Sequence, residues 1–329
     1  MLNITLDLLE QIGDVAKRAG QEIMNIYETD FAVEAKADSS PVTEADKAAE
    51  ALIIRSIREG ITDKFPIVGE ESFAAGNAPV VGDAPFWLVD PLDGTKEFVN
   101  RNGEFTVNIA MIDGGRPALG VIHVPVTKRT YWGAKIGVFA QVGNEDDRLI
   151  QCREAPVDGL VAMVSRSHRT TEVDIFLADY TIASETSAGS SLKFCLIAEG
   201  SADIYPRLGR TMEWDTAAGH AILQFAGGTV QDLDGNDLHY GKPGFENSHF
   251  VAKGPGVLEA GNSGCPCPTT EPPSLPPTPT TFLPPPGASA KAGLSPFPPK
   301  PSMASVSTPP TTKPSQLCSR PRTGPGSTR

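Results

Sequence analysis

The sequence predicts a fold that mixes α+β and α/β organisation, with an α+β part at residues 1–155, an α/β part at 156–253 and a disordered, Pro-rich tail at 254–329. Three observations predict it. Helical patterns come first and short apolar runs follow. Strands and helices then alternate from residue 156 onwards. Finally, the last 76 residues contain 20 of the 30 prolines and little apolar periodicity, so they cannot bury enough surface to order themselves.

Two helices are expected at the start of the chain. Residues 4–27 repeat apolar side chains at intervals of three and four, which is typical of an amphipathic helix. A second helix is expected to begin at Thr43, because Asp46 follows three residues later in the spacing of a capping box. Its buried face is expected to contain Ala49, Leu52, Ile53 and Ile57.

Strand patterns follow these helices. The apolar runs are FPIVG, PFWLVD, TVNIAMI, ALGVIHV, TYWGA and GVFAQV, and the Gly, Pro and Asp turns between them predict a largely antiparallel sheet. After Pro156 the order is strand LVAMVS, helix TEVDIFLADY, strand TIASET, helix SSLKFCLIAEG, strand ADIYPR and helix WDTAAGHAILQFAGG. Gly227 and Gly228 fit the C-terminus of that last helix. This alternation predicts the α/β part.

Charge and composition narrow the function. The net charge is −12 and Lys and Arg form no cluster, which argues against nucleic acid as a partner because that binding needs a concentrated basic face. No apolar run suits a transmembrane helix, and the five cysteines, including Cys265 and Cys267 in the tail, suggest neither a disulfide framework nor a zinc site. We expect a cytoplasmic protein with a small anionic ligand; peripheral attachment to the cytoplasmic face of the inner membrane is the alternative. The oligomeric state stays open.

The stretch VDPLDGTKEF carries the strongest chemical signal. Asp90 ends an apolar run, and Pro91 has no N–H for a strand ladder, so the chain is expected to leave the sheet at this point. Asp93, as a cap residue, precedes Gly94 and Thr95 in a pattern typical of a helix start. The free backbone N–H groups of such a start attract phosphate.

Carboxylates beside a phosphate site make physical sense only if hard cations lie between them, because the anions would otherwise repel each other. Mg²⁺ is the natural candidate, held by the Asp oxygens and the Leu92 carbonyl. The alternative for this stretch alone is an ordinary Asx turn followed by a helix cap. Further acids in the sequence favour the metal site.

These further acids also lie at predicted element ends. IVGEES ends a strand, and since extended side chains alternate faces, one of Glu70 and Glu71 can enter a cleft; the alternative is a surface turn. Asp215 opens a helix of small residues and, viewed alone, is expected to be its N-cap, while Asp46 viewed alone is a capping-box residue. Acids at several element ends, one of them followed by a phosphate-compatible helix start, predict a metal-dependent phosphatase.

Five motifs together resemble a known family. They are VTEAD at 42–46, VGEES at 68–72, VDPLDGTKEF at 89–98, SSLKFCLIAEGSADIYPR at 190–207 and WDTAAGHAIL at 214–223. They are similar to motifs of the inositol monophosphatase superfamily, specifically of the bacterial 3′(2′),5′-bisphosphate nucleotidases of the CysQ type. The resemblance runs from about Leu8 to Phe250 and implies a layered αβαβα sandwich of the inositol monophosphatase and sugar phosphatase type. GTKEF, LKFCLIAEG and IYPR favour the nucleotidase branch over the inositol branch.

The resemblance also implies roles for individual residues. The implied Mg²⁺ ligands are Glu70, Asp90, the Leu92 carbonyl, Asp93 and Asp215. This selects Glu70 over Glu71, which spacing alone leaves open. Thr95, hydrogen-bonded to Asp46, is implied to orient and deprotonate a metal-bound water that attacks phosphorus in line. The amides of Gly94 and Thr95 would bind the phosphate, so no covalent phosphoenzyme is needed.

The implied substrate is 3′-phosphoadenosine 5′-phosphate, which would lose its 3′-phosphate to give AMP. The residues implied to bind it are Glu70, Leu92, Asp93, Gly94, Thr95, Lys193, Tyr205, Arg207 and Asp215. Lys193, Tyr205 and Arg207 are the candidates for the second phosphate and the adenine, although Lys193 can equally be a solvated helix residue and Tyr205 a core aromatic. His220, one helical turn beyond Asp215, is expected to be a core histidine, or one that supports a ligand, rather than a ligand itself.

Two other readings of the function stay open. An inositol monophosphatase or a fructose bisphosphatase-like sugar phosphatase would apply the same metal chemistry to another substrate. A scaffold protein is the alternative of a different class, because the PPSLPP and PPTP stretches of the tail are typical of polyproline II ligands for SH3-like domains. Family members usually stop soon after HFVAKG, so the tail is either a fused segment or a gene-model artefact.

Overall fold

The computed structural model describes residues 2–28, 33–35, 41–82, 84–166 and 169–258. The described residues fall within one compact unit. The predicted tail beyond residue 258 lies outside the described residues, and the division of the preceding chain into two parts at residue 155 stays a prediction.

The unit contains both helices and strands. The helices are α1 (Leu6–Tyr27), α2 (Glu44–Gly60), α3 (Glu70–Ala74), α4 (Thr95–Val99), α5 (Thr171–Leu177), α6 (Leu192–Ala198) and α7 (Glu213–Phe225), with a short 3-10 helix at Pro243–Phe245. The strands up to residue 149 are β1 (Val33–Ala35), β2 (Pro41–Thr43), β3 (Ile67–Gly69), β4 (Phe86–Asp93), β5 (Thr106–Asp113), β6 (Arg116–Val124), β7 (Arg129–Ala134), β8 (Gly137–Val142) and β9 (Arg148–Leu149). The later strands are β10 (Leu160–Ser165), β11 (Ile182–Ala188), β12 (Ile204–Arg207), β13 (Thr229–Asp232) and β14 (Phe250–Lys253).

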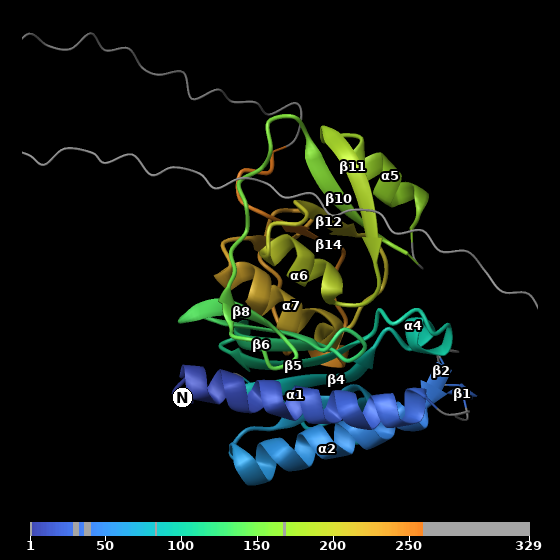
Figure 1. Ribbon diagram of the computed structural model, residues 1–329, viewed down its shortest axis with the longest axis vertical. Helices are drawn as coiled ribbons and strands as arrows, with labels where there is room; N and C mark the ends of the chain where they lie inside the picture. The colour runs from blue at the N-terminus through green and yellow to red at the C-terminus, as the bar shows by residue number, and fades with distance from the viewer. Residues whose placement is uncertain (1, 29–32, 36–40, 83, 167–168, 259–329) are drawn as a thin grey trace, which may run out of the picture. The chain divides into compact units, whose positions relative to one another are not determined.

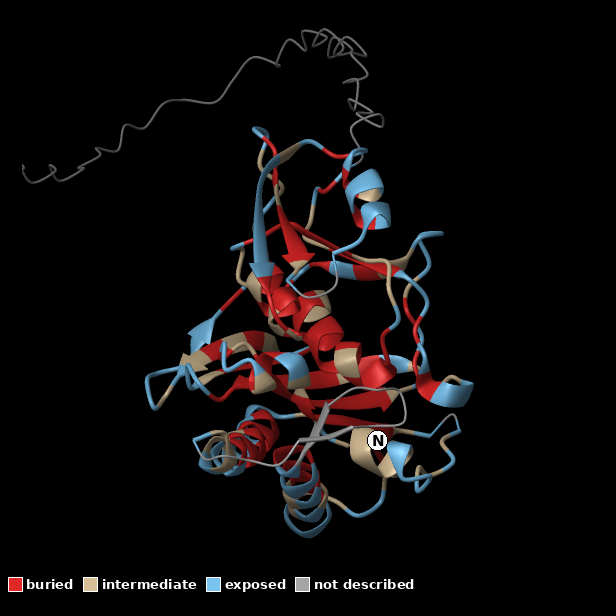
Figure 2. Ribbon diagram, turned by 90° about the vertical axis from the view of Figure 1, so that its right-hand side faces the viewer, coloured by how far each residue is buried: buried red, intermediate tan, exposed pale blue. Residues whose placement is uncertain are grey.

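These elements form the layered αβαβα architecture that the family resemblance implies. Helices α1 and α2 pack together against one face of a seven-stranded sheet, and α7 packs against its other face (Figure 1). Helices α6 and α7 lie between this sheet and a five-stranded sheet, and α5 lies on the far side of the second sheet (Figure 1). Figure 2 shows the buried residues concentrated in the sheets and in the helices between them, as burial of apolar surface requires.

The two N-terminal helices follow their sequence patterns closely. The hydroxyl of Thr5 caps α1 by accepting the backbone N–H of Leu8 at 3.2 Å, which confirms the helix predicted at residues 4–27. Helix α2 begins at Glu44, directly after Thr43. Of its predicted inner face, Ala49, Ile53 and Ile57 are fully buried and Leu52 is half-buried.

The seven-stranded sheet places the acidic motif. Its order is β3-β4-β5-β6-β7-β8-β9; the β3–β4 pair is parallel and the other pairs are antiparallel, as predicted. The expectation that the chain leaves the sheet at Asp90 is wrong. Asp90 pairs with Asn108 and Asp93 pairs with Thr106, with a register shift between them. A bulge therefore absorbs Pro91, which has no N–H to donate to a ladder.

The five-stranded sheet has the order β11-β10-β12-β14-β13. Strand β10 pairs in parallel with β11 and β12, which agrees with the predicted alternation of strands and helices, while β14 pairs antiparallel with β12 and β13. Packing continues past residue 253, because Pro255 accepts the N–H of Ala155 at 3.1 Å and Val257 is buried.

No helix in the described part of the chain is long and apolar enough to span a membrane.

Candidate active site

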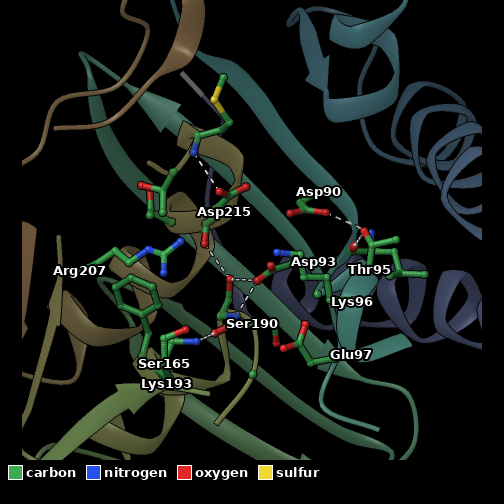
Figure 3. A pocket seen from close by; sticks show the side chains of 18 of the residues that line it. Asp90, Asp93, Thr95, Lys96, Glu97, Ser165, Ser190, Lys193, Arg207 and Asp215 are labelled. Atoms are coloured by element: carbon green, nitrogen blue, oxygen red, sulfur yellow. Dashed lines mark hydrogen bonds between the residues drawn. The ribbon is translucent and has the colours of Figure 1, made fainter. Parts of the chain in front are cut away.

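A cavity of about 240 Å³ lies where α3, the end of β4, α4, the start of α6, β12 and α7 come together (Figure 3). It brings most of the predicted site residues together. The predicted residues that line it are Glu70, Asp90, Leu92, Asp93, Gly94, Thr95, Lys193, Tyr205, Arg207 and Asp215. Asp46 is the exception among the predicted residues: it lies fully buried in the first turn of α2, near enough to Asp90 for its charge to raise the pKa of that carboxyl.

Asp90 is an almost fully buried acid of the site. It is 1% exposed, and its Oδ1 accepts the backbone N–H of Leu92 at 3.1 Å across the bulge. Burial raises its pKa well above the usual range, and the negative charges of its acidic neighbours raise it further. Those neighbours are Glu70, Asp93, Asp215 and Asp46. Four acids from separate elements therefore act electrostatically on one carboxyl.

Asp93 is held by side chains of β5 and of the segment before α6. Its Oδ2 accepts both the backbone N–H and the hydroxyl of Ser191, each at 2.6 Å, and the side-chain amide of Asn108 at 3.4 Å. Burial raises the pKa of Asp93, and the bonds from Ser191 and the charge of Lys193 oppose that rise. The orientation of this carboxylate is thus fixed by a residue of the segment before α6.

Asp215 occupies the third position of α7 rather than its N-cap, so the expectation for this residue is wrong. The helix begins two residues earlier at Glu213, with Met212 as the N-cap, and Oδ2 of Asp215 accepts the Met212 N–H at 2.9 Å. The Asp215 carboxylate thus caps the start of α7 from within its first turn. Burial raises its pKa well above the usual range, as do Asp93 and Glu70.

The turn after β4 begins a helix as predicted, but Gly94 is the N-cap instead of Asp93. Its φ of +91° lies in the left-handed region, where a residue with a side chain would be strained. The hydroxyl of Thr95 donates to the Leu92 carbonyl at 3.5 Å. The proposed hydrogen bond between Thr95 and Asp46 stays a prediction.

The structure separates the two adjacent glutamates that strand alternation left open. Glu70 is the first residue of α3 and lines the cavity. Glu71 follows within the helix, and its backbone N–H donates to the buried carboxylate of Glu50 at 2.8 Å. The geometry thus agrees with the choice of Glu70 as the residue that faces the site.

The cationic and aromatic candidates lie together. Lys193 is 4% exposed and donates to the backbone carbonyls of Ala188 and Ser190, so it is not a solvated helix residue. Its ammonium lies 5.1 Å from the ring centroid of Tyr205, and burial lowers its pKa to about 8. Arg207 donates to a backbone carbonyl at 3.2 Å and also lines the cavity.

Tyr205 satisfies both readings that the sequence left open. Its ring packs edge-on against Phe194 and Phe250, so it is a core aromatic, and it also lines the cavity. His220 is a buried histidine, as expected, with Nδ1 2.9 Å from the hydroxyl of Tyr240. Burial lowers the pKa of His220 to about 4, so the ring is neutral near pH 7.

Sequence reasoning missed several residues of the site. Ser191 bonds Asp93, and its hydroxyl also lies 2.7 Å from the Asp215 carbonyl and 2.8 Å from the amide of Asn108. Arg210 also lines the cavity. A polar Asn108 inside the apolar run TVNIAMI was a usable signal, because a buried amide needs partners. Ser191 carries no comparable signal, because its partner Asp93 lies 98 residues away in the sequence.

The donor set fits a hard divalent cation. Carboxylates and the Leu92 carbonyl are oxygen ligands of the kind that Mg²⁺ prefers, and a cation among them would offset the burial and repulsion that raise the pKa values of Asp90 and Asp215. Within the described residues, no three acidic, His or Cys side chains close around a single point as a finished metal site. The fit therefore rests on the donor chemistry and the shared cavity.

Comparison with known proteins agrees with this architecture. Residues 7–261 match the inositol monophosphatase family. The 3′(2′),5′-bisphosphate nucleotidase CysQ of Salmonella typhimurium is 45% identical over 235 residues, which is 71% of this chain and 94% of the relative. The CysQ nucleotidase of Escherichia coli K12 is 44% identical over 242 residues, with the same shares covered.

Solved structures show the same likeness. A crystal structure of CysQ from Bacteroides thetaiotaomicron, a bacterial member of the inositol monophosphatase family, has a TM-score of 0.63 and 37% identity, covering 75% of this chain and 97% of that one. The Thermotoga maritima IMPase has a TM-score of 0.62 and 26% identity, covering 75% and 92%. The chain belongs to the inositol monophosphatase family and is a phosphatase. Enzymes of this family depend on metal, typically Mg²⁺.

Proposed function

We propose that this protein is a Mg²⁺-dependent phosphatase that hydrolyses the 3′-phosphate of 3′-phosphoadenosine 5′-phosphate to give AMP and phosphate. The observation that carries the proposal is one cavity that joins an acidic group to two cations. Figure 3 shows Asp90, Asp93 and Asp215 around this cavity, with Lys193 and Arg207 beside them. A substrate with two phosphates suits such a wall, since one phosphate can lie near the acids through a cation while the other meets the basic side chains.

The residues that would hold Mg²⁺ are Glu70, Asp90, the Leu92 carbonyl, Asp93 and Asp215. When bound, the ion supplies neutralisation of phosphate charge and a lowered pKa of water. The support for this set is that all five residues line the cavity with oxygen donors. Ser191 and the Met212 N–H fix the orientation of two of these carboxylates, as the partners of metal ligands generally do.

The remaining roles belong to the turn after β4 and to α2. The backbone N–H groups of Gly94 and Thr95 bind the phosphate that is removed, next to the left-handed Gly94. The hydroxyl of Thr95, together with the buried carboxylate of Asp46, orients the attacking water and takes its proton. Because water attacks phosphorus directly, the chain needs no nucleophilic side chain.

The far end of the cavity would receive the nucleotide. Arg207 and Lys193 provide positive charge for the 5′-phosphate, and Tyr205 provides an aromatic surface for the base. Since Lys193 already donates to two backbone carbonyls, its contribution is a fixed positive charge more than a flexible contact. The similarity to 3′(2′),5′-bisphosphate nucleotidases supports this substrate.

The test is a comparison of substrates with purified protein and Mg²⁺. We expect phosphate release from 3′-phosphoadenosine 5′-phosphate to have a higher kcat/KM than release from inositol 1-phosphate or fructose 1,6-bisphosphate. Faster release from either of the other two would assign the protein to a different branch while keeping the metal chemistry. A cytoplasmic location, with a small molecule as the partner, remains part of the proposal.

A further inference from the structure

Glu50 is a buried acid of α2 that lies behind the cavity wall. It is 4% exposed and follows Asp46 by one helical turn, so the two side chains project from the same face of the helix. Its Oε2 accepts the backbone N–H of Glu71 at 2.8 Å. Its Oε1 accepts the backbone N–H of Ser72 at 2.8 Å and the Ser72 hydroxyl at 2.5 Å. Both carboxylate oxygens are therefore used by the first turn of α3.

Helix α3 depends on this remote carboxylate because it has no local cap. Its N-cap is Gly69, which has no side chain to accept the N–H groups of the first turn. A Cβ on Gly69 would lie 2.4 Å from Oε2 of Glu50, so any side chain there would displace the carboxylate. Glycine at this position and glutamate at position 50 thus form one arrangement.

The segment held in this way begins with Glu70, which lines the cavity. Glu50 accepts the backbone N–H groups of Glu71 and Ser72, the two residues that follow Glu70. These bonds fix the backbone beside Glu70 and therefore the direction of its side chain. Since Asp46 lies one turn before Glu50 on α2, the same contact also sets the distance between the cavity acid Glu70 and the proposed base Asp46.

We infer that Glu50 is a positioning residue that holds Glu70 in register with Asp46 for divalent-cation binding. The inference rests on the proposed function, because it assumes that Glu70 is a metal ligand. A purely structural cap would lower the stability of the protein when removed and leave cation affinity unchanged. Removal of a positioning residue also lowers the affinity of the folded protein for the cation.

The deciding variant is Glu50→Gln. Its amide keeps the shape of the side chain, but whichever oxygen the NH₂ group replaces, it faces a backbone N–H, and two donors repel. Isothermal titration with Mn²⁺ alone measures cation affinity without turnover. We expect the Kd for Mn²⁺ to rise about tenfold or more in a variant that still melts cooperatively, since supporting residues of metal ligands contribute about 10–100-fold. Glu59→Gln, an exposed glutamate of the same helix, is the matched control and should bind Mn²⁺ as the wild type does.

Gly69→Ala provides a second, independent route. The φ of Gly69 is −109°, which alanine adopts freely, and the methyl group meets the end of the Glu50 side chain rather than backbone atoms, so this variant should fold. It should weaken Mn²⁺ binding in the same way, and it decides the matter if Glu50→Gln fails to fold. Wild-type Mn²⁺ affinity in a folded Glu50→Gln or Gly69→Ala protein would overturn the inference alone, whereas a wild-type protein that binds no Mn²⁺ would overturn the proposed function with it.

Discussion

Removing the hydroxyl of Ser191 tests how the structure holds Asp93. In the Ser191→Ala variant, Oδ2 of Asp93 loses a bond of 2.6 Å and keeps the backbone N–H of residue 191 at the same distance. The carbonyl of Asp215 and the amide of Asn108 lose their contacts with the same hydroxyl, at 2.7 and 2.8 Å. One change thus loosens groups on β4, β5 and α7.

The expected magnitude follows from these bonds. A hydrogen bond to a charged group contributes about 1.5–3 kcal/mol, and we take the lower end because the backbone N–H continues to hold the carboxylate. Since about 1.4 kcal/mol corresponds to a factor of ten, kcat/KM should fall about tenfold. The buried amide of Asn108 loses an acceptor, so the free energy of unfolding should also fall by about 1–2 kcal/mol.

The assay is phosphate release from 3′-phosphoadenosine 5′-phosphate at saturating Mg²⁺, with urea unfolding measured on the same preparation. Ser201→Ala is the control, because Ser201 is exposed and its hydroxyl, in the described contacts, bonds only Glu199, which does not line the cavity. The reasoning would be refuted by a Ser191→Ala enzyme that keeps kcat/KM within about twofold of wild type, since the hydroxyl would then contribute nothing to the orientation of Asp93.

Three further outcomes are expected. Asp93→Asn should reduce turnover by about 100-fold or more while the melting temperature without metal stays level or rises, because one charge leaves a repelling group; near-normal turnover would contradict the ligand assignment. His220 is neutral in the folded state down to about pH 4 but protonates near pH 6.5 when unfolded, so stability falls as the pH drops through this window. His220→Gln should lessen that fall by about 2–3 kcal/mol in urea unfolding at pH 7 and 4.5, and an unchanged fall would show that the histidine does not cause it. Truncation after Leu258 should leave kcat/KM unchanged, whereas loss of activity would assign the tail a part in catalysis.

The sequence allowed the elements and most acids of the site to be predicted because both depend on local signals. The helical repeat of residues 4–27 predicted α1. The predicted acids at element ends include Asp90, Asp93 and Asp215, which line one cavity. Without the family resemblance, the sequence could not show which of Glu70 and Glu71 faces the site. That choice depends on how Glu50 in another helix caps α3.

The errors have a common physical cause. Pro91 stays within the span of β4 because a bulge accommodates it, and a bulge is decided by the partner strand. Asp215 is the third residue of its helix because the chain turns at Met212, which has no cap-forming side chain to mark it in the sequence. Ser191 bonds Asp93 and Asn108, which are so far away in the sequence that local patterns could not pair them.

The proposed activity depends on divalent cations that these acids hold beside the phosphate that is removed. The most direct measurement is the anomalous scattering of a crystal soaked with Mn²⁺ and inorganic phosphate. The proposed activity predicts an anomalous peak for a Mn²⁺ ion among its expected ligands, which are Glu70, Asp90, the Leu92 carbonyl, Asp93 and Asp215. It also predicts phosphate against the amides of Gly94 and Thr95. A well-ordered cavity with no peak among these oxygens, at Mn²⁺ concentrations that support turnover, would contradict it.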